Sequence, residues 1–327
     1  MITIEGSASL NLVKEQIDES LSIAESNLEQ YVEEPDNDSR LRTSIEQFSL
    51  IKGVFKLINL PSAAMLAEEL EQLGLYIVNH HQHKNERELA TISGAIMLLM
   101  YYLEYVQVKR QALPVLLIPA INEVRGLLAK PLVAESTFFD LPNNPPRPDK
   151  AGSPAADTAQ IDQTGRRLRH LFQVGMLGIF RQQNIATNVK MMHRAVTRLD
   201  GLCGNAPGAK LLWLAQGVLE GLGSGKLEVN NARKSLLGQI DRHIKHLVFQ
   251  TDSTLKKDSP AAVVKECVYL ASLSGPNGDA LKQIAQVYQF DAAAVSDETL
   301  RAERDIMRGP GGSVIRSVAE ALNEELT

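Results

Sequence analysis

The stretch from residue 45 to residue 73 carries the strongest folding signal in this sequence, because its apolar residues recur at the spacing of a helix turn. When residues 45–58 are placed on a helix, one face holds four large apolar side chains: Phe48, Ile51, Phe55 and Ile58. The opposite face is polar and contains Gly53, although glycine in the middle of a helix costs about 1 kcal/mol relative to alanine. The pattern predicts an amphipathic helix in which Gly53 lets another surface approach the backbone.

The polar face of this helix resembles the docking helix of histidine phosphotransfer (HPt) domains, whose pattern is H-x-L-K-G-x-A-x-x-x-G. The matching positions here are Ser49, Ile51, Lys52, Gly53, Phe55 and Asn59. Serine stands where HPt domains have the phosphate-accepting histidine, and a hydroxyl is a poor nucleophile without a neighbouring base. We therefore predict a partner-binding surface that carries no phosphate, made of Arg42, Glu46, Ser49, Lys52, Gly53 and Lys56. The alternative interpretation is an ordinary bundle helix.

The first 130 residues predict an HPt-like up-down helix bundle, since several amphipathic segments follow one another with short turns. Asn59 can adopt the left-handed conformation that glycine has in the HPt pattern, and Pro61 suits the first turn of the next helix. The expected helices span about residues 9–31, 39–59, 61–79, 86–111 and 114–129. Low aromatic content (5%) also favours an all-α fold over sheets.

Residues 131–160 differ in composition and predict a Pro/Ala-rich linker, because six of the 14 prolines lie between Pro131 and Pro154. A second helical domain is expected from residue 161 to residue 327. A faint repeat within residues 161–250 indicates a second degenerate HPt-like bundle, in which Trp213 takes the position of Ser49, followed by C-terminal helices. The expected helices are 158–183, 185–201, 207–222, 228–250, 260–274, 279–288, 298–307 and 313–326.

Composition favours a cytoplasmic protein without membrane insertion. Cys203 and Cys267 are far apart in the sequence, which is typical of lone thiols in a reducing compartment. The N-terminal residues show no basic region followed by an apolar core and a cleavage site, so no secretory signal is predicted. The most apolar window, residues 95–105, is too short to span a bilayer.

Charge is segregated along the chain. Residues 1–130 hold 11 Lys and Arg against 18 Asp and Glu, whereas residues 161–250 hold 13 against 5. A basic block can bind nucleic acid, and this function remains an alternative. The cations are spread along helices with few aromatic residues among them, however, which favours docking of an acidic partner and predicts no nucleic acid.

The sequence predicts no enzyme, cofactor or metal site. It contains no phosphate-binding loop, dinucleotide-binding glycine motif or nucleophile elbow. His80, His81 and His83 lie in a polar loop, and His243 and His246 lie on a basic helix that would repel a cation. An active phosphotransfer protein that uses another histidine, such as His80 or His81, remains an alternative.

Taken together, these segments are similar to the FimL family, which in turn resembles the N-terminal part of the chemotaxis-type kinase ChpA. The resemblance rests on the proline-rich stretch and on SLIKGVFKLINLPSAAMLAEELEQL, RRLRHLFQVGMLGIFRQQN, LLWLAQGVLEGL and KECVYLASLSG. It implies a non-catalytic scaffold, placed at the cell pole, that links the chemosensory pathway of type IV pilus twitching motility to cyclic-AMP production. The implied partners are the polar hub protein FimV and a receiver-type response regulator. Longer members of the family continue beyond the last helix.

Overall fold

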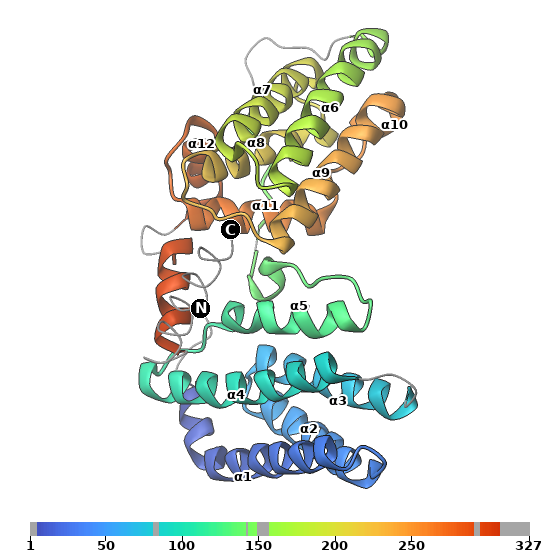
Figure 1. The fold of residues 1–327 in the computed structure, drawn as a ribbon. Coiled ribbons are helices and arrows are strands. Elements are labelled where there is room, and N and C mark those ends of the chain that lie inside the picture. Colours follow the sequence, from blue (N-terminus) through green and yellow to red (C-terminus); the bar gives the residue numbers. More distant parts are fainter. Residues whose placement is uncertain (1–4, 81–84, 142, 149–156, 291–294, 308–327) are drawn as a thin grey trace. The chain divides into compact units, whose positions relative to one another are not determined.

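The computed structural model describes residues 5–80, 85–141, 143–148, 157–290 and 295–307. Within these ranges the chain consists of helices joined by loops, so the predicted all-α class is confirmed (Figure 1). The helix expected over residues 313–326 lies outside the described residues. The chain divides into two compact units: unit 1 comprises Met1–Val133 and Arg301–Thr327, and unit 2 comprises Ala134–Leu300.

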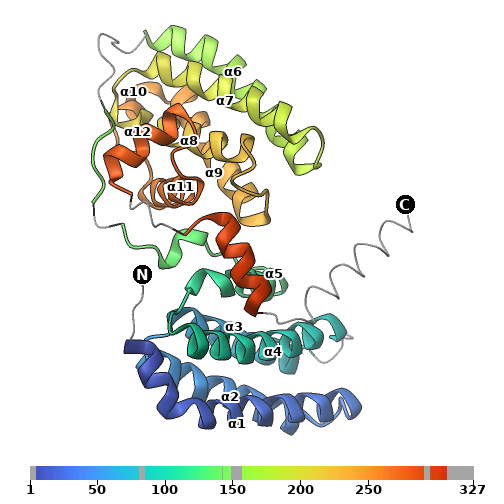
Figure 2. The ribbon, with the colours of Figure 1, turned by 90° about the vertical axis from the view of Figure 1, so that its left-hand side faces the viewer.

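Unit 1 is a helical bundle in which α2 packs against α1 and α3, while α4 packs against the same two helices (Figure 2). Helix α5 completes the bundle by packing against α3 and α4. The elements are α1 (Glu5–Glu33), α2 (Asp38–Leu57), α3 (Pro61–Asn79), α4 (Glu86–Lys109), η1 (Pro114–Leu117) and α5 (Ile118–Leu127). The single segment expected over residues 114–129 is therefore divided into a 3₁₀ turn and an α-helix. The likeness to HPt domains stays a prediction.

The apolar face of α2 forms the centre of unit 1. Phe48, Ile51 and Phe55 are fully buried, as the periodicity predicted. The approach of α3 is close, because a methyl group at Gly74 would lie 2.6 Å from Cγ1 of Ile45. On the other side, the Ser44 hydroxyl donates to the carbonyl of Ala24 in α1 at 2.8 Å. The buried hydroxyl of Ser44 is therefore hydrogen-bonded, as most buried polar groups in proteins are.

Helix α4 contains the apolar window noted at residues 95–105. The whole helix is long and apolar enough to cross a membrane by length and composition, so the short window alone does not exclude a span. Its packing is that of a core helix, because one face is buried in the bundle: Ile92, Ala95, Ile96, Leu99, Tyr102, Leu103, Tyr105 and Val106. Burial raises the pKa of the Tyr102 hydroxyl to about 12.

Unit 2 is built around α8 (Lys210–Gly223), which packs against α7, α11 and α12. The surrounding elements are η2 (Glu135–Phe138), α6 (Thr158–Phe180), α7 (Ile185–Cys203), η3 (Pro207–Ala209), α9 (Asn231–Phe249), α10 (Thr251–Leu255), α11 (Ala261–Ser274) and α12 (Asp279–Tyr288). Residues 297–307 are also helical, and the division between the units falls within them.

Helix α8 is buried along almost its whole length. Trp213, which the repeat aligned with Ser49, is only 3% exposed. At Gly217, an added methyl group would lie 2.5 Å from Cδ1 of Ile284 in α12, so α12 closes over this helix. The second repeat therefore offers no open face at the position of Trp213 that corresponds to the exposed serine of α2.

Part of the proline-rich stretch packs within unit 2. The Arg147 guanidinium donates to the fully buried carboxylate of Asp200 at 2.6 Å. The Lys210 ammonium donates to Oδ1 of Asn144 at 2.5 Å and also to the carbonyl of Pro145. These contacts hold the chain against unit 2 without regular secondary structure.

A buried charge cluster fixes the start of the same stretch. The Arg233 guanidinium donates to Glu135 at 3.0 Å and to Asp297 at 2.5 Å, and all three side chains are at most 6% exposed. The Glu266 carboxylate accepts the backbone N–H groups of Ser136 at 2.8 Å and Glu135 at 3.2 Å. Burial raises the pKa of Glu266 despite these hydrogen bonds.

Candidate partner-binding site

The face of α2 that the sequence predicted as a docking surface is open to solvent. Arg42, Glu46, Ser49, Gly53 and Lys56 are exposed, and Lys52 is half-buried at the edge of the same face. All six come from one helix whose opposite side is held in the core, so their relative positions are fixed by the helix geometry. We call these six residues the α2 face.

Lys52 is the member of the α2 face that contacts a side chain of another helix. Its ammonium forms an ion pair with Glu71 of α3, and both side chains are about one-fifth exposed. By contrast, Arg42 and Lys56 form no ion pair with any other described residue. These two exposed cations are consequently the ones available to a negatively charged partner.

Gly53 leaves open space on the α2 face. No atom lies within 4 Å of a methyl group placed on it, so the glycine is not required by packing inside this chain. Two exposed leucines border it on the same helix, Leu50 at 58% and Leu57 at 87% exposure. The sequence analysis did not select these leucines, because their helical positions lie between the polar stripe and the buried stripe. They add apolar area to a surface that a partner could cover.

The Gly53→Ala variant should raise the free energy of unfolding of unit 1 by about 0.5–1 kcal/mol, because alanine has the higher helix propensity and meets no neighbour. Urea denaturation followed by circular dichroism measures the change. The control is Gly74→Ala in α3, where the methyl group would strike Ile45 and stability should fall. A destabilised Gly53→Ala variant would show that the site is crowded.

Helix α2 ends with the left-handed residue that the sequence analysis considered at Asn59. Asn59 has a φ of 57°, in the left-handed region. The backbone N–H of Leu60 donates to the carbonyl of Phe55 at 2.9 Å, and that of Asn59 donates to Lys56 at 3.4 Å. This pair of bonds is a Schellman motif. Pro61 then occupies the first turn of α3, as predicted.

Ser49 lies on this face without an activating group. It makes no hydrogen bond to another described side chain, so nothing there removes its proton. The described histidines lie elsewhere: His80 at the end of α3, stacked on Tyr76, His170 on α6, His193 on α7 and the exposed His246 on α9. His243 is buried against the carbonyl of Gly208, and burial lowers its pKa. His81 and His83 lie outside the described residues.

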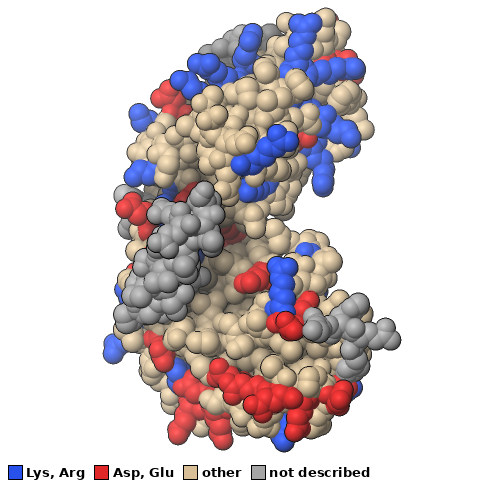
Figure 3. Space-filling view, viewed as in Figure 1, with Lys and Arg blue, Asp and Glu red and all other residues tan. Residues whose placement is uncertain are grey.

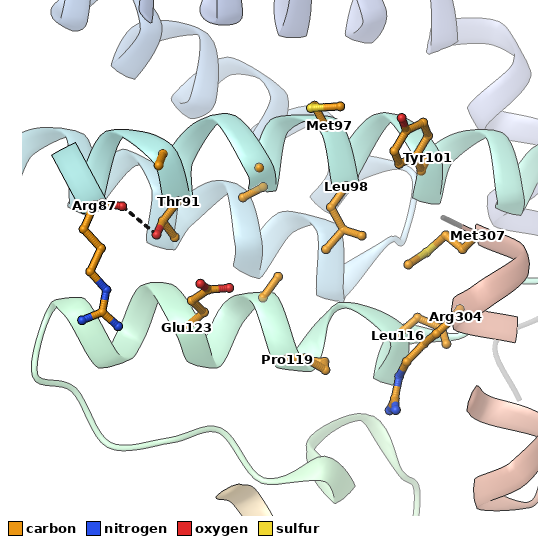
Figure 4. Close-up of a pocket in the computed structure, with 14 residues that line it drawn as sticks. Arg87, Thr91, Met97, Leu98, Tyr101, Leu116, Pro119, Glu123, Arg304 and Met307 are labelled. Atoms are coloured by element: carbon orange, nitrogen blue, oxygen red, sulfur yellow. Dashed lines mark hydrogen bonds between the residues drawn. The ribbon is translucent and has the colours of Figure 1, made fainter. Parts of the chain in front are cut away.

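A groove that the sequence did not reveal lies elsewhere in unit 1, between α4 and the η1–α5 segment. Its volume is about 560 Å³. Figure 4 shows Arg87 and Glu123 at one end and Tyr101, Arg304 and Met307 at the other. Small residues of α4, among them Gly94, form much of its floor. Among the residues that the structure describes, no group of three or more His, Cys, Asp and Glu side chains is placed to hold a metal ion.

Comparison with known proteins matches both parts of the chain to one family. The family model described as "FimL scaffold protein second domain" matches residues 157–301, and the model described as "FimL C-terminal domain" matches residues 6–123. The chain is 34% identical to scaffold protein FimL of Pseudomonas aeruginosa strain PAO1 over 324 residues. That alignment covers 99% of this chain and 57% of the relative, so the chain spans little more than half of the relative's length. No solved structure matches the chain.

Proposed function

Because the chain belongs to the FimL family, we propose that it is a non-catalytic scaffold of the chemosensory and cyclic-AMP pathway that controls type IV pilus twitching motility. In this role it binds a receiver-type response regulator through the α2 face and does not accept its phosphate. The polar hub protein FimV is the second proposed partner, and the proposed location is the cytoplasm at the cell pole. The name of the relative, a scaffold protein, supports a binding role.

The exposure of Ser49 is the observation that carries this proposal. An HPt domain presents its histidine on an open helical face, and here the corresponding serine is exposed with Gly53 uncovered one turn further along. A serine phosphate ester is too stable to pass phosphate onward, and Ser49 has no base beside it to form one. The surface is thus suited to recognition without transfer.

Charge on the α2 face supports a receiver as the partner. Receiver domains have an acidic phosphorylation pocket, and Arg42 and Lys56 are exposed cations on the matching face. Charged groups of opposite sign speed the encounter of two proteins and fix their orientation. Glu46 lies between the two cations in the sequence. It would repel a partner whose own acidic groups lie directly opposite Glu46 and not opposite Arg42 or Lys56.

The double variant Arg42→Glu/Lys56→Glu should bind the receiver domain of a type IV pilus response regulator about 10-fold more weakly than the wild type, because like charges then face each other. Isothermal titration calorimetry with the full chain measures the affinity. The Lys52→Glu change is less informative, since it would also break the ion pair with Glu71 and place a second carboxylate next to that residue.

Arg40→Glu is the matched control, because Arg40 is exposed on the same helix outside the α2 face. It should leave the affinity within about two-fold of the wild type. Equal losses in the control and the double variant would show that binding responds to net charge and not to the α2 face.

A further inference from the structure

Unit 2 carries exposed positive charge that its own acidic residues do not neutralise. Figure 3 shows Lys and Arg side chains gathered over this unit. Some cations are paired, as Arg169 is with Asp241 at 2.8 Å. The exposed cations of the α6–α7 pair that form no ion pair with a described residue are Arg167, Arg181, Lys190, Arg194 and Arg198. This part of the surface can therefore attract an acidic molecule.

Helix α6 also exposes a row of large apolar side chains. Leu171, Val174, Leu177 and Phe180 follow one another at three-residue spacing and are 42%, 45%, 48% and 40% exposed. Because each step of three residues shifts the direction by about 60°, the row runs obliquely across the exposed side of the helix. We call these four residues the α6 row. Single exposed apolar side chains are normal on a protein, but a continuous row marks an interaction surface. The buried side of the same helix already has its own partners, α7 and α9.

The α6 row and the cations of α7 lie on neighbouring helices that pack closely along their lengths. A methyl group at Gly175 would lie 2.5 Å from Cγ of Met192, and one at Gly178 would lie 2.1 Å from the amide nitrogen of Asn188. These glycines bring the two backbones together, so the exposed sides of α6 and α7 border each other. The surface combines the α6 row with Arg167 and Arg181 at its two ends and with the cations of α7 on the neighbouring helix.

We propose that this α6–α7 surface is a second docking site, which binds an acidic amphipathic helix of a partner protein. The partner helix would lay its apolar stripe along the α6 row and place carboxylates opposite Arg167 and Arg198 near one end and Arg181 at the other. This site belongs to unit 2 and is distinct from the α2 face of unit 1, and each of the two surfaces is proposed to bind an acidic partner.

A helix fits the observations better than a membrane or a nucleic acid does. Each side chain of the α6 row is at least half-covered by its neighbours, whereas insertion into a bilayer requires apolar side chains that reach about 5–10 Å into it. Nucleic acid would leave the α6 row uncovered, because phosphate groups are bound by cations and bases by aromatic or polar groups. Opposite charges around an apolar strip are the features of helix recognition on a protein surface.

The test uses the full chain and a labelled synthetic helix of about 20 residues, with leucines at heptad spacing and flanking glutamates. Fluorescence anisotropy should show saturable binding to the wild type. The variants Arg167→Glu/Arg198→Glu and Val174→Asn/Leu177→Asn should each weaken binding at least about 10-fold. The matched control Lys226→Glu/Lys234→Glu reverses two charges of unit 2 outside this surface and should have little effect.

A version of the peptide with lysines in place of the glutamates provides a rescue experiment. It should fail to bind the wild type and should bind the Arg167→Glu/Arg198→Glu variant more tightly than the wild type, although Arg181 still opposes one end of it. The proposal is overturned if neither peptide binds, or if the control variant loses as much affinity. It is also overturned if vesicles with about 30% phosphatidylserine, or duplex DNA, bind the wild type through the same residues while the peptide does not. Loss of receiver binding at the α2 face would not affect any of these outcomes.

Discussion

Replacing Arg233 with methionine should lower the free energy of unfolding of unit 2 by about 3–5 kcal/mol, because it leaves the carboxylates of Glu135 and Asp297 buried beside each other without a cation. The guanidinium is 3% exposed and bonds both acids. Burial opposes its charge, but the two acids outweigh burial and raise the pKa of Arg233 above its ordinary value. Removal therefore costs the desolvation of two charges and not only the ion pairs themselves.

Tryptophan fluorescence measures this effect in unit 2 alone. Trp213 is the one tryptophan of the chain and lies in the buried helix α8. Urea unfolding of the full chain, followed at this residue, reports unit 2 even when unit 1 unfolds separately. The variant Arg166→Met is the control, since that guanidinium is 57% exposed and solvent screens its pair with Asp162, so its loss should have little effect on stability.

The triple variant Arg233→Met/Glu135→Gln/Asp297→Asn separates loss of charge pairing from loss of packing. It removes the buried charges together with the arginine, so it should recover part of the lost stability. A triple variant as unstable as Arg233→Met would show that the arginine acts through its packed side chain. An Arg233→Met variant with unchanged stability would mean that the cluster does not hold the 135–148 segment in place.

Helix bounds could be predicted where turn residues and apolar spacing in the sequence marked the same segment that packs as a helix in the structure. The turn residues before Asp279 and the apolar spacing up to Tyr288 predicted α12 at its observed bounds. Pro61 likewise marked the start of α3. Helix α10 (Thr251–Leu255) was not predicted: it falls between the expected helices 228–250 and 260–274, and its five residues are too few to show a helical period.

The packing of the proline-rich stretch did not follow from sequence. Proline content indicates that a segment lacks helix and strand, and it says nothing of whether the segment is packed. The contacts that hold residues 135–148 come from far along the chain, such as Arg233, Asp200 and Lys210. Helical spacing does not show that Arg233 is buried, because its partners Glu135 and Asp297 lie 98 and 64 residues away in the sequence.

Most residues of the α2 face could be predicted from the sequence. When one stripe of a helix with 3.6 residues per turn is buried in the core, the residues on the opposite side face solvent. The exposure of Ser49 and the open space at Gly53 came from that rule. The pairing of Lys52 with Glu71 did not, since it depends on the register between α2 and α3. Trp213, which the faint repeat aligned with Ser49, is buried, because almost every residue of α8 is buried and its sequence carries no polar stripe.

On the proposed function, the Ser49→His variant should make the α2 face accept phosphate from the receiver domain that it binds. A neutral imidazole attacks an acyl phosphate directly: a nitrogen–phosphorus bond forms as the bond between phosphorus and the receiver's aspartate breaks. At pH 7.5 most of the introduced histidine is neutral, since its ordinary pKa is about 6.5. The position is exposed, with Lys56, which forms no ion pair with a described residue, on the same side of the helix to face the phosphate.

Incubation with a ³²P-labelled phospho-receiver should leave the wild-type chain unlabelled and give acid-labile label on Ser49→His. The matched control is Leu50→His, which places an exposed histidine one residue away on a different side of α2 and should stay unlabelled. Acid-labile label on the wild type would instead identify another histidine as the carrier. Equal labelling of both histidine variants would show that the receiver does not dock on the α2 face in the orientation of a phosphotransfer partner.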